Sequence, residues 1–241
     1  FTGGGHPDAG LNPSYWQRVD YFITTAAAYG ITVFLNIAYT ADGATGDGNF
    51  ASGAALDPAT VTQAMYADYG TAVAQRYSAA PNLVWIYGND QFGGNDTQFG
   101  YIRAAVAAAD AGNHAVAVHD YPESTSRYDT ETATGGQVPS TFSYDFSQVN
   151  WCYTYNVTYY TLELAYKEAA AHSISQLPAV WGDGYFVYAG ASIPPETLER
   201  QMTWWAVASG GRGVNATSND VWPWGSGSLS DSQTQNWYAA I

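Results

Sequence analysis

Two hydrophobic patterns alternate along this chain: stretches with a helical period and short, continuous apolar runs. Asn12-Pro13 predicts the start of a helix, as N-cap and first-turn proline, and Gly30 predicts its end. The run from Ile31 to Ala38 is typical of a buried strand. Asp57-Pro58 predicts the start of the next helix in the same way.

The alternation continues to the end of the sequence. The apolar runs predict strands that end at Tyr87 and that cover 115–118, 149–153, 179–181 and 213–215. The helical periods predict helices over about 97–111 and 159–172, and a last helix that starts at Pro194-Pro195. Trp204 and Trp205 in that last helix are expected to lie in the core. Strands that alternate strictly with helices imply a parallel sheet.

This order of elements predicts an α/β fold, specifically a TIM-type (β/α)8 barrel. A closed barrel has eight strands, and only six are predicted here. The chain also begins with Phe1 to Asp8, which has the composition of a loop. We therefore expect one barrel domain over residues 1–241 that lacks its first two βα units at the N-terminal end. A missing segment or a partner chain would then complete the barrel.

Two of the predicted strands end in glycine followed by a carboxylate. Asp90 follows Gly88-Asn89, and Asp183 follows Gly182. Barrels of this type keep their chemistry at the carboxyl ends of the strands. A carboxylate pair there can hydrolyse a glycosidic bond, with Asp90 as the acid and Asp183 attacking or activating water. The structural alternatives are a turn or N-cap at Asp90 and an ordinary Asp-Gly turn at Asp183.

Other polar and aromatic residues are candidates for substrate contact. Asn89 can donate to a sugar hydroxyl, and His119, which follows the strand over 115–118, is predicted to contact substrate rather than to bind metal. His6, in the glycine-rich first segment, receives the same interpretation. Aromatic side chains that could stack on sugar faces are Trp151, Tyr153, Tyr155, Trp181, Tyr185 and Trp222. No motif in the sequence indicates a metal or a cofactor.

Composition narrows the class of partner. The chain has 241 residues, a formal net charge of −14 and only seven basic residues, so nucleic acid and an anionic membrane surface are disfavoured. Low charge with many Ser, Thr, Asn, Gly and Tyr residues is typical of an exported protein. Asn95, Asn156 and Asn215 begin glycosylation triplets. We expect a secreted protein, glycosylated if its source is a secreting eukaryote, with a carbohydrate as its partner.

Several segments together resemble the apiosidase-like glycoside hydrolases, which are (β/α)8 barrels. They are Gly3 to Asp8, Tyr15 to Asp20, Ala28 to Val33, Arg76 to Asp90, Pro178 to Asp183 and the segment from Arg200 to Trp222. The resemblance implies a retaining-type pair with Asp90 as acid/base and Asp183 in the nucleophile position. The family usually has Glu where Asp183 stands, and Asp is shorter by one methylene, about 1.5 Å.

Two functions follow from these observations. The first is a secreted glycoside hydrolase that uses Asp90 and Asp183. The second is a non-catalytic carbohydrate-binding or structural barrel derived from such an enzyme, which the shorter Asp183 and the short N-terminal end both favour.

Overall fold

The computed structural model describes residues 10–38, 54–88, 96–119, 146–150, 179–183 and 213–214, and the single positions 197, 200, 203, 204, 207 and 208. The chain divides into two compact units, which are described separately. One comprises Phe1–Val118 and Glu131–Asp145, and the other comprises His119–Thr130 and Phe146–Ile241. A single domain over residues 1–241 stays a prediction.

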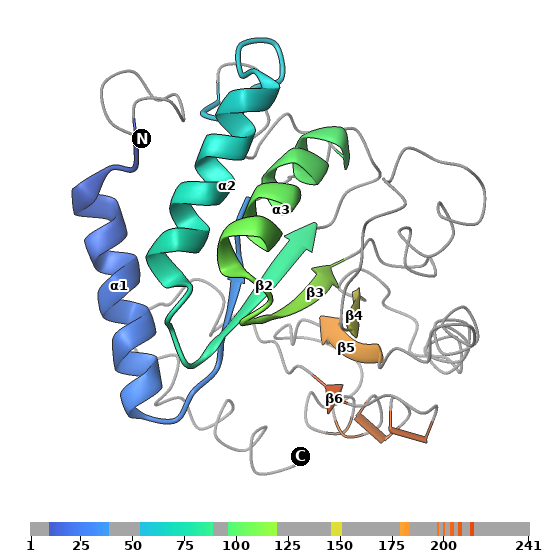
Figure 1. The fold of residues 1–241 in the computed structure, drawn as a ribbon. Coiled ribbons are helices and arrows are strands. Elements are labelled where there is room, and N and C mark those ends of the chain that lie inside the picture. Colours follow the sequence, from blue (N-terminus) through green and yellow to red (C-terminus); the bar gives the residue numbers. More distant parts are fainter. Residues whose placement is uncertain are drawn as a thin grey trace. The chain divides into compact units, whose positions relative to one another are not determined.

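The first unit alternates helices and strands, as the sequence predicts. Its elements are α1 (Pro13–Ala28), β1 (Val33–Asn36), α2 (Gln63–Tyr77), β2 (Leu83–Gly88), α3 (Asp96–Asp110) and β3 (Ala115–His119), of which the residues up to Val118 belong to this unit. The strands lie in the order β1, β2, β3, and β1 pairs in parallel with β2. The helices lie side by side next to these strands (Figure 1), with α2 packed most closely against α3.

The second unit contains three strands. These are β4 (Phe146–Asn150), β5 (Ala179–Asp183) and β6 (Gly213–Val214), in that order. Both β4 and β6 pair in parallel with β5. Parallel strands in each unit confirm the α/β class, because parallel pairs need crossover connections between them.

Local signals account for both ends of α1. The Asn12 Oδ1 atom accepts hydrogen bonds from the backbone nitrogens of Ser14 (3.0 Å) and Tyr15 (3.3 Å), so Asn12 is the predicted N-cap. After the helix, Gly30 has φ +70°, a left-handed conformation that glycine adopts without strain.

The predicted start of α2 at Asp57-Pro58 is wrong. The helix begins at Gln63, with Thr62 as its N-cap. Asp57 instead closes a turn, because its Oδ1 atom accepts from the backbone nitrogen of Ala59 (2.8 Å) and its carbonyl accepts from that of Val61 (2.9 Å). Asp often bonds its own backbone two residues on, and that local bond competes with helix formation.

Three other sequence predictions need correction. β1 covers only Val33–Asn36, because the Ile31 nitrogen still donates to the carbonyl of Ala26 in α1. β4 (Phe146–Asn150) starts three residues before the predicted start at 149, because the pairing of its polar residues with β5 starts at Ser147, and positions 151–153 lie outside the described residues. Trp204 is 65% exposed and therefore not a core residue. Helical spacing places Trp204 on one face with the exposed Arg200 and Val207. The predicted helix over 159–172 lies outside the described residues.

The core of the first unit lies between its helices and β2. Every residue from Leu83 to Tyr87 is buried, and Trp85 and Tyr87 have no exposed surface. A strand buried on both faces is typical of a parallel sheet. The helices contribute Trp16 and Ile23 from α1, Val73 from α2 and Ile102 from α3.

Close packing of α2 on α3 predicts an unusual effect at Gly70. Alanine normally stabilises a helix interior relative to glycine by about 1 kcal/mol. A Cβ at Gly70, however, would collide with the backbone carbonyl oxygen of Ile102 and crowd the Cβ of Ala105 at 3.1 Å. We expect Gly70→Ala to lower the free energy of unfolding by about 1–3 kcal/mol. Urea unfolding measures this, with Gln75→Ala at an exposed α2 position as the control, and a stabilised Gly70→Ala variant would contradict the packing.

An ion pair between α1 and α2 predicts a loss of stability in acid. Asp20 accepts two hydrogen bonds from the Arg76 guanidinium, one of them 2.7 Å from Nε, and one of 2.9 Å from the Tyr77 hydroxyl. The Arg76 hydrogen bonds are the main cause that lowers the pKa of Asp20 below its ordinary 3.8. The stabilisation is therefore complete above that ordinary value and is lost as pH falls through the lowered pKa.

We expect Asp20→Asn to lower the free energy of unfolding by about 0.5–1 kcal/mol at pH 7, because the pair is partly exposed. The difference from wild type should shrink below about pH 4. Urea unfolding at pH 7 and pH 3 tests this, with Asp68→Asn as the exposed control. A difference that grows in acid would contradict the assignment.

Candidate active site

Polar residues end four of the five longer strands. Asn36 ends β1, His119 ends β3, Asn150 ends β4 and Asp183 ends β5. The exception is β2, which ends at Gly88, immediately before the predicted Asn89 and Asp90. Carboxyl ends of parallel strands are where barrels of this class hold their active sites. Each of these residues therefore lies at the kind of strand position where such active sites are built.

The described part of the chain contains three of the predicted site residues. Asp183 is the last residue of β5, Trp181 lies two residues before it and pairs with Val149 and Val214, and His119 ends β3. The others lie outside the described residues. They are His6, Asn89, Asp90, Trp151, Tyr153, Tyr155, Tyr185 and Trp222. Their roles stay predictions, as do those of Asp183, Trp181 and His119.

Sequence reasoning missed Asn36 and Asn150 as strand-end residues. Asn36 follows an apolar run, which is the same signal that identified Asp90 and Asp183. The predicted strand over 149–153 makes Asn150 an interior residue, whereas β4 has Asn150 as its last described residue. In β4 and β5, Asn150 and Asp183 are paired positions. The second unit thus brings an amide residue and a carboxylate residue to neighbouring strand ends.

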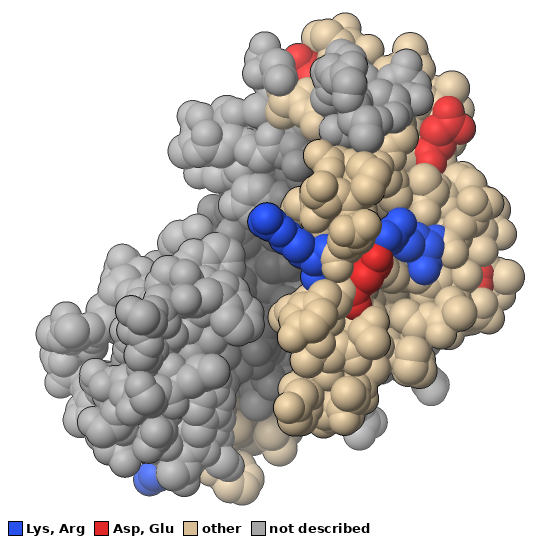
Figure 2. Space-filling view, turned by 90° about the vertical axis from the view of Figure 1, so that its left-hand side faces the viewer, with Lys and Arg blue, Asp and Glu red and all other residues tan. Residues whose placement is uncertain are grey.

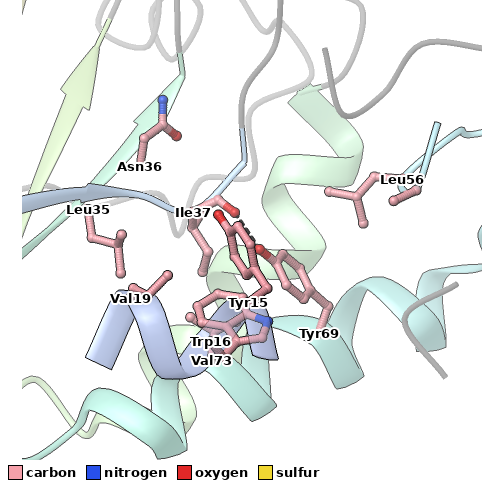
Figure 3. A pocket seen from close by; sticks show the side chains of 10 residues that line it. Tyr15, Trp16, Val19, Leu35, Asn36, Ile37, Leu56, Tyr69 and Val73 are labelled. Atoms are coloured by element: carbon pink, nitrogen blue, oxygen red, sulfur yellow. Dashed lines mark hydrogen bonds between the residues drawn. The ribbon is translucent and has the colours of Figure 1, made fainter. Parts of the chain in front are cut away.

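A cavity of about 350 Å³ lies beside the carboxyl end of β1 in the first unit. Its lining comes from α1, from the end of β1 and the residue after it, from the segment before α2, and from α2. These residues are Tyr15, Trp16 and Val19, then Leu35, Asn36 and Ile37, then Ala55 and Leu56, and finally Tyr69 and Val73. Figure 3 shows Leu35 and Asn36 projecting to opposite sides of β1. The volume falls in the range of small-molecule pockets.

Tyrosine hydroxyls fix the backbone around this cavity. Tyr69 donates to the carbonyl of Ile37 at 2.7 Å (Figure 3), and Tyr66 donates to that of Leu56 at 2.7 Å. Burial is the main cause that raises the pKa of Tyr69, and it also raises the pKa of Tyr66 to about 12. Both phenols are therefore neutral donors near neutral pH. Tyr69 holds Ile37, just past the end of β1, and Tyr66 holds Leu56, so neither phenol is a candidate base.

One face of the molecule shows few charged side chains among its described residues. Figure 2 shows a few basic side chains beside acidic ones on one face, surrounded by uncharged residues. Where the structure describes side chains, no group of three His, Cys, Asp or Glu residues is arranged to hold a metal ion. No helix among the described elements is long and apolar enough to cross a bilayer.

Comparisons with solved structures define the class of fold. A glycoside hydrolase family 5 protein from Bacteroides vulgatus matches 92% of this chain and 48% of its own, with 19% identity and a TM-score of 0.65. A second structure, named a glycoside hydrolase, matches 100% of this chain and 55% of its own, with 16% identity and a TM-score of 0.66. Thermotoga maritima Cel5A, in complex with mannotriose substrate, matches 86% of this chain and 72% of its own, with 11% identity and a TM-score of 0.61.

These structures are (β/α)8 barrels, and the chain, with its parallel strands, has the fold of a partial barrel of this class. It spans about half the length of the first two. The model of the apiosidase-like catalytic domain matches residues 4–241, and the chain therefore belongs to that family. No curated protein sequence matches it.

Proposed function

We propose that this chain hydrolyses glycosidic bonds at the carboxyl ends of its strands. The observation that carries the proposal is the position of Asp183 as the last residue of β5 in a chain of the apiosidase-like family. Asp90, just past the end of β2, is the proposed acid that protonates the departing oxygen. Asp183 attacks the anomeric carbon or activates water for that attack.

The family name indicates which sugar to test first. A terminal apiosyl residue is the proposed substrate group, and the predicted aromatic residues suit a neutral carbohydrate. Asn89, His119, His6 and the predicted aromatic residues are the proposed substrate contacts. No metal or cofactor enters the proposed reaction.

The experiment is a hydrolysis assay with a panel of aryl glycosides. The panel contains 4-nitrophenyl apioside together with mannosides and cellobiosides, because mannotriose is the substrate in the T. maritima structure and related structures hold cellobiose. We expect release of nitrophenol from the apioside. Proton NMR of the first-formed sugar then distinguishes retention from inversion. No release from any member of the panel would overturn the proposal.

The second candidate function is carbohydrate binding without hydrolysis. The observation that favours it is Asp at position 183, where the resemblance implies the longer Glu. In that case, wild-type protein would bind an apioside in calorimetry but would not cleave it. Asp183→Glu would then be a direct test. If this variant hydrolysed the apioside, the carboxylate of Asp183 would have been too short to reach the sugar.

A further inference from the structure

A β-bulge determines which residue of β4 lies beside Asp183. The paired positions are Ser147 with Ala179, Gln148 with Val180, Val149 with Trp181 and Asn150 with Asp183. The register shifts between Val149 and Asn150, so Gly182 is an extra residue on β5. Without this bulge, Asp183 would pair with position 151 instead.

The bulge matters because strand side chains alternate between two faces. A shift of one residue moves a side chain to the opposite face of the sheet. Bulges often occur beside active sites, where they redirect a side chain. Glycine suits the extra position, since it tolerates backbone conformations that other residues avoid. The bulge at Gly182 therefore makes the Asn150 position, at the end of β4, the neighbour of Asp183.

We propose that Asn150 is the positioning residue for Asp183, an inference that rests on the function proposed above. Adjacent strands lie about 4.8 Å apart, which is within reach of an amide and a carboxylate on paired positions. The amide group of asparagine donates hydrogen bonds but carries no charge. It can therefore orient a carboxylate by donating a hydrogen bond, and it does not itself take up a proton near neutral pH.

The first test compares kinetic constants for an aryl glycoside that wild type cleaves. We expect Asn150→Ala and Asn150→Asp to lower kcat by about 10- to 100-fold with KM nearly unchanged, because a misplaced catalytic group costs about that much. Asn150→Asp keeps the shape of the side chain and removes the amide donor, so it remains informative if the alanine variant folds poorly. Gln148→Ala, on the same strand and paired with Val180, is the control and should keep the wild-type kcat.

A second arm separates positioning from a merely structural role. Azide can replace the missing carboxylate in Asp183→Ala, and a free anion needs no positioning by residue 150. Adding Asn150→Ala to that variant should lower the azide-rescued rate by less than about threefold. If Asn150→Ala lowered the rate equally in wild type and in azide-rescued Asp183→Ala, or if Asn150→Asp kept the wild-type kcat, this inference alone would be overturned. A wild type without turnover would overturn the proposed function and this inference together.

Discussion

Asp183→Asn is expected to lower kcat by about 10³- to 10⁴-fold, while apioside binding measured by calorimetry stays within about threefold of wild type. Asparagine keeps the size of the side chain but can neither attack the anomeric carbon nor accept a proton from water. The sugar itself is held by other residues, so its affinity should survive. This combination of lost turnover and kept binding defines a catalytic carboxylate.

The matched control for this variant is Asp68→Asn, an exposed change on α2 in the other unit. It should retain the wild-type kcat. Addition of azide to an Asp183→Ala variant should restore part of the rate. If Asp183→Asn retained full turnover, Asp183 would be neither nucleophile nor base, and the carboxylate would belong to a structural turn.

Asp110→Ala is expected to lower the free energy of unfolding by about 3–5 kcal/mol. Asp110 Oδ1 lies 2.6 Å from His114 Nδ1, and Asp110 Oδ2 accepts from the His114 backbone nitrogen at 3.0 Å. His114 Nε2 lies 2.6 Å from the carbonyl of Ala80. The two side chains are only 5% and 3% exposed, so neither can turn to water for a replacement partner.

Urea unfolding of wild type and Asp110→Ala measures this loss. Asp110→Asn keeps an acceptor oxygen near His114 and should cost less than the alanine variant. Asp68→Ala, on the exposed face of α2, should change the free energy of unfolding by less than about 0.5 kcal/mol. A loss below about 1 kcal/mol for Asp110→Ala would show that this buried pair does not hold the end of α3 to the segment before β2.

Local chemistry explains which elements were predictable from the sequence. Asn12 lies at the start of α1 and Gly30 just after its end, as expected. Both signals are local, because an N-cap and a left-handed residue depend only on the backbone of neighbouring residues. The same reasoning failed at Asp57, whose side chain closes a turn that the residue pattern does not distinguish from a helix start. β4 was placed too late because its position depends on pairing with β5, which lies about thirty residues further along the chain.

The residues of the candidate site also differ in whether a local sequence signal identifies them. Asp183 was predicted because a carboxylate directly follows an apolar run, and β5 does end at that residue. The proposed role of Asn150 was not predicted, since it depends on the extra residue Gly182 and the resulting register. Trp204 shows the opposite error, because a tryptophan in an amphipathic pattern suggested the core although its helical face is exposed.

The distance between the carboxyl groups of Asp90 and Asp183 decides whether the two residues can act as a catalytic pair. A crystal structure of the chain with a bound sugar would provide it. We expect about 5–5.5 Å for a retaining pair or about 6.5–9.5 Å, with room for water, for an inverting one. A separation well beyond that range, or either carboxylate bonded into its own turn, would contradict catalysis by this pair.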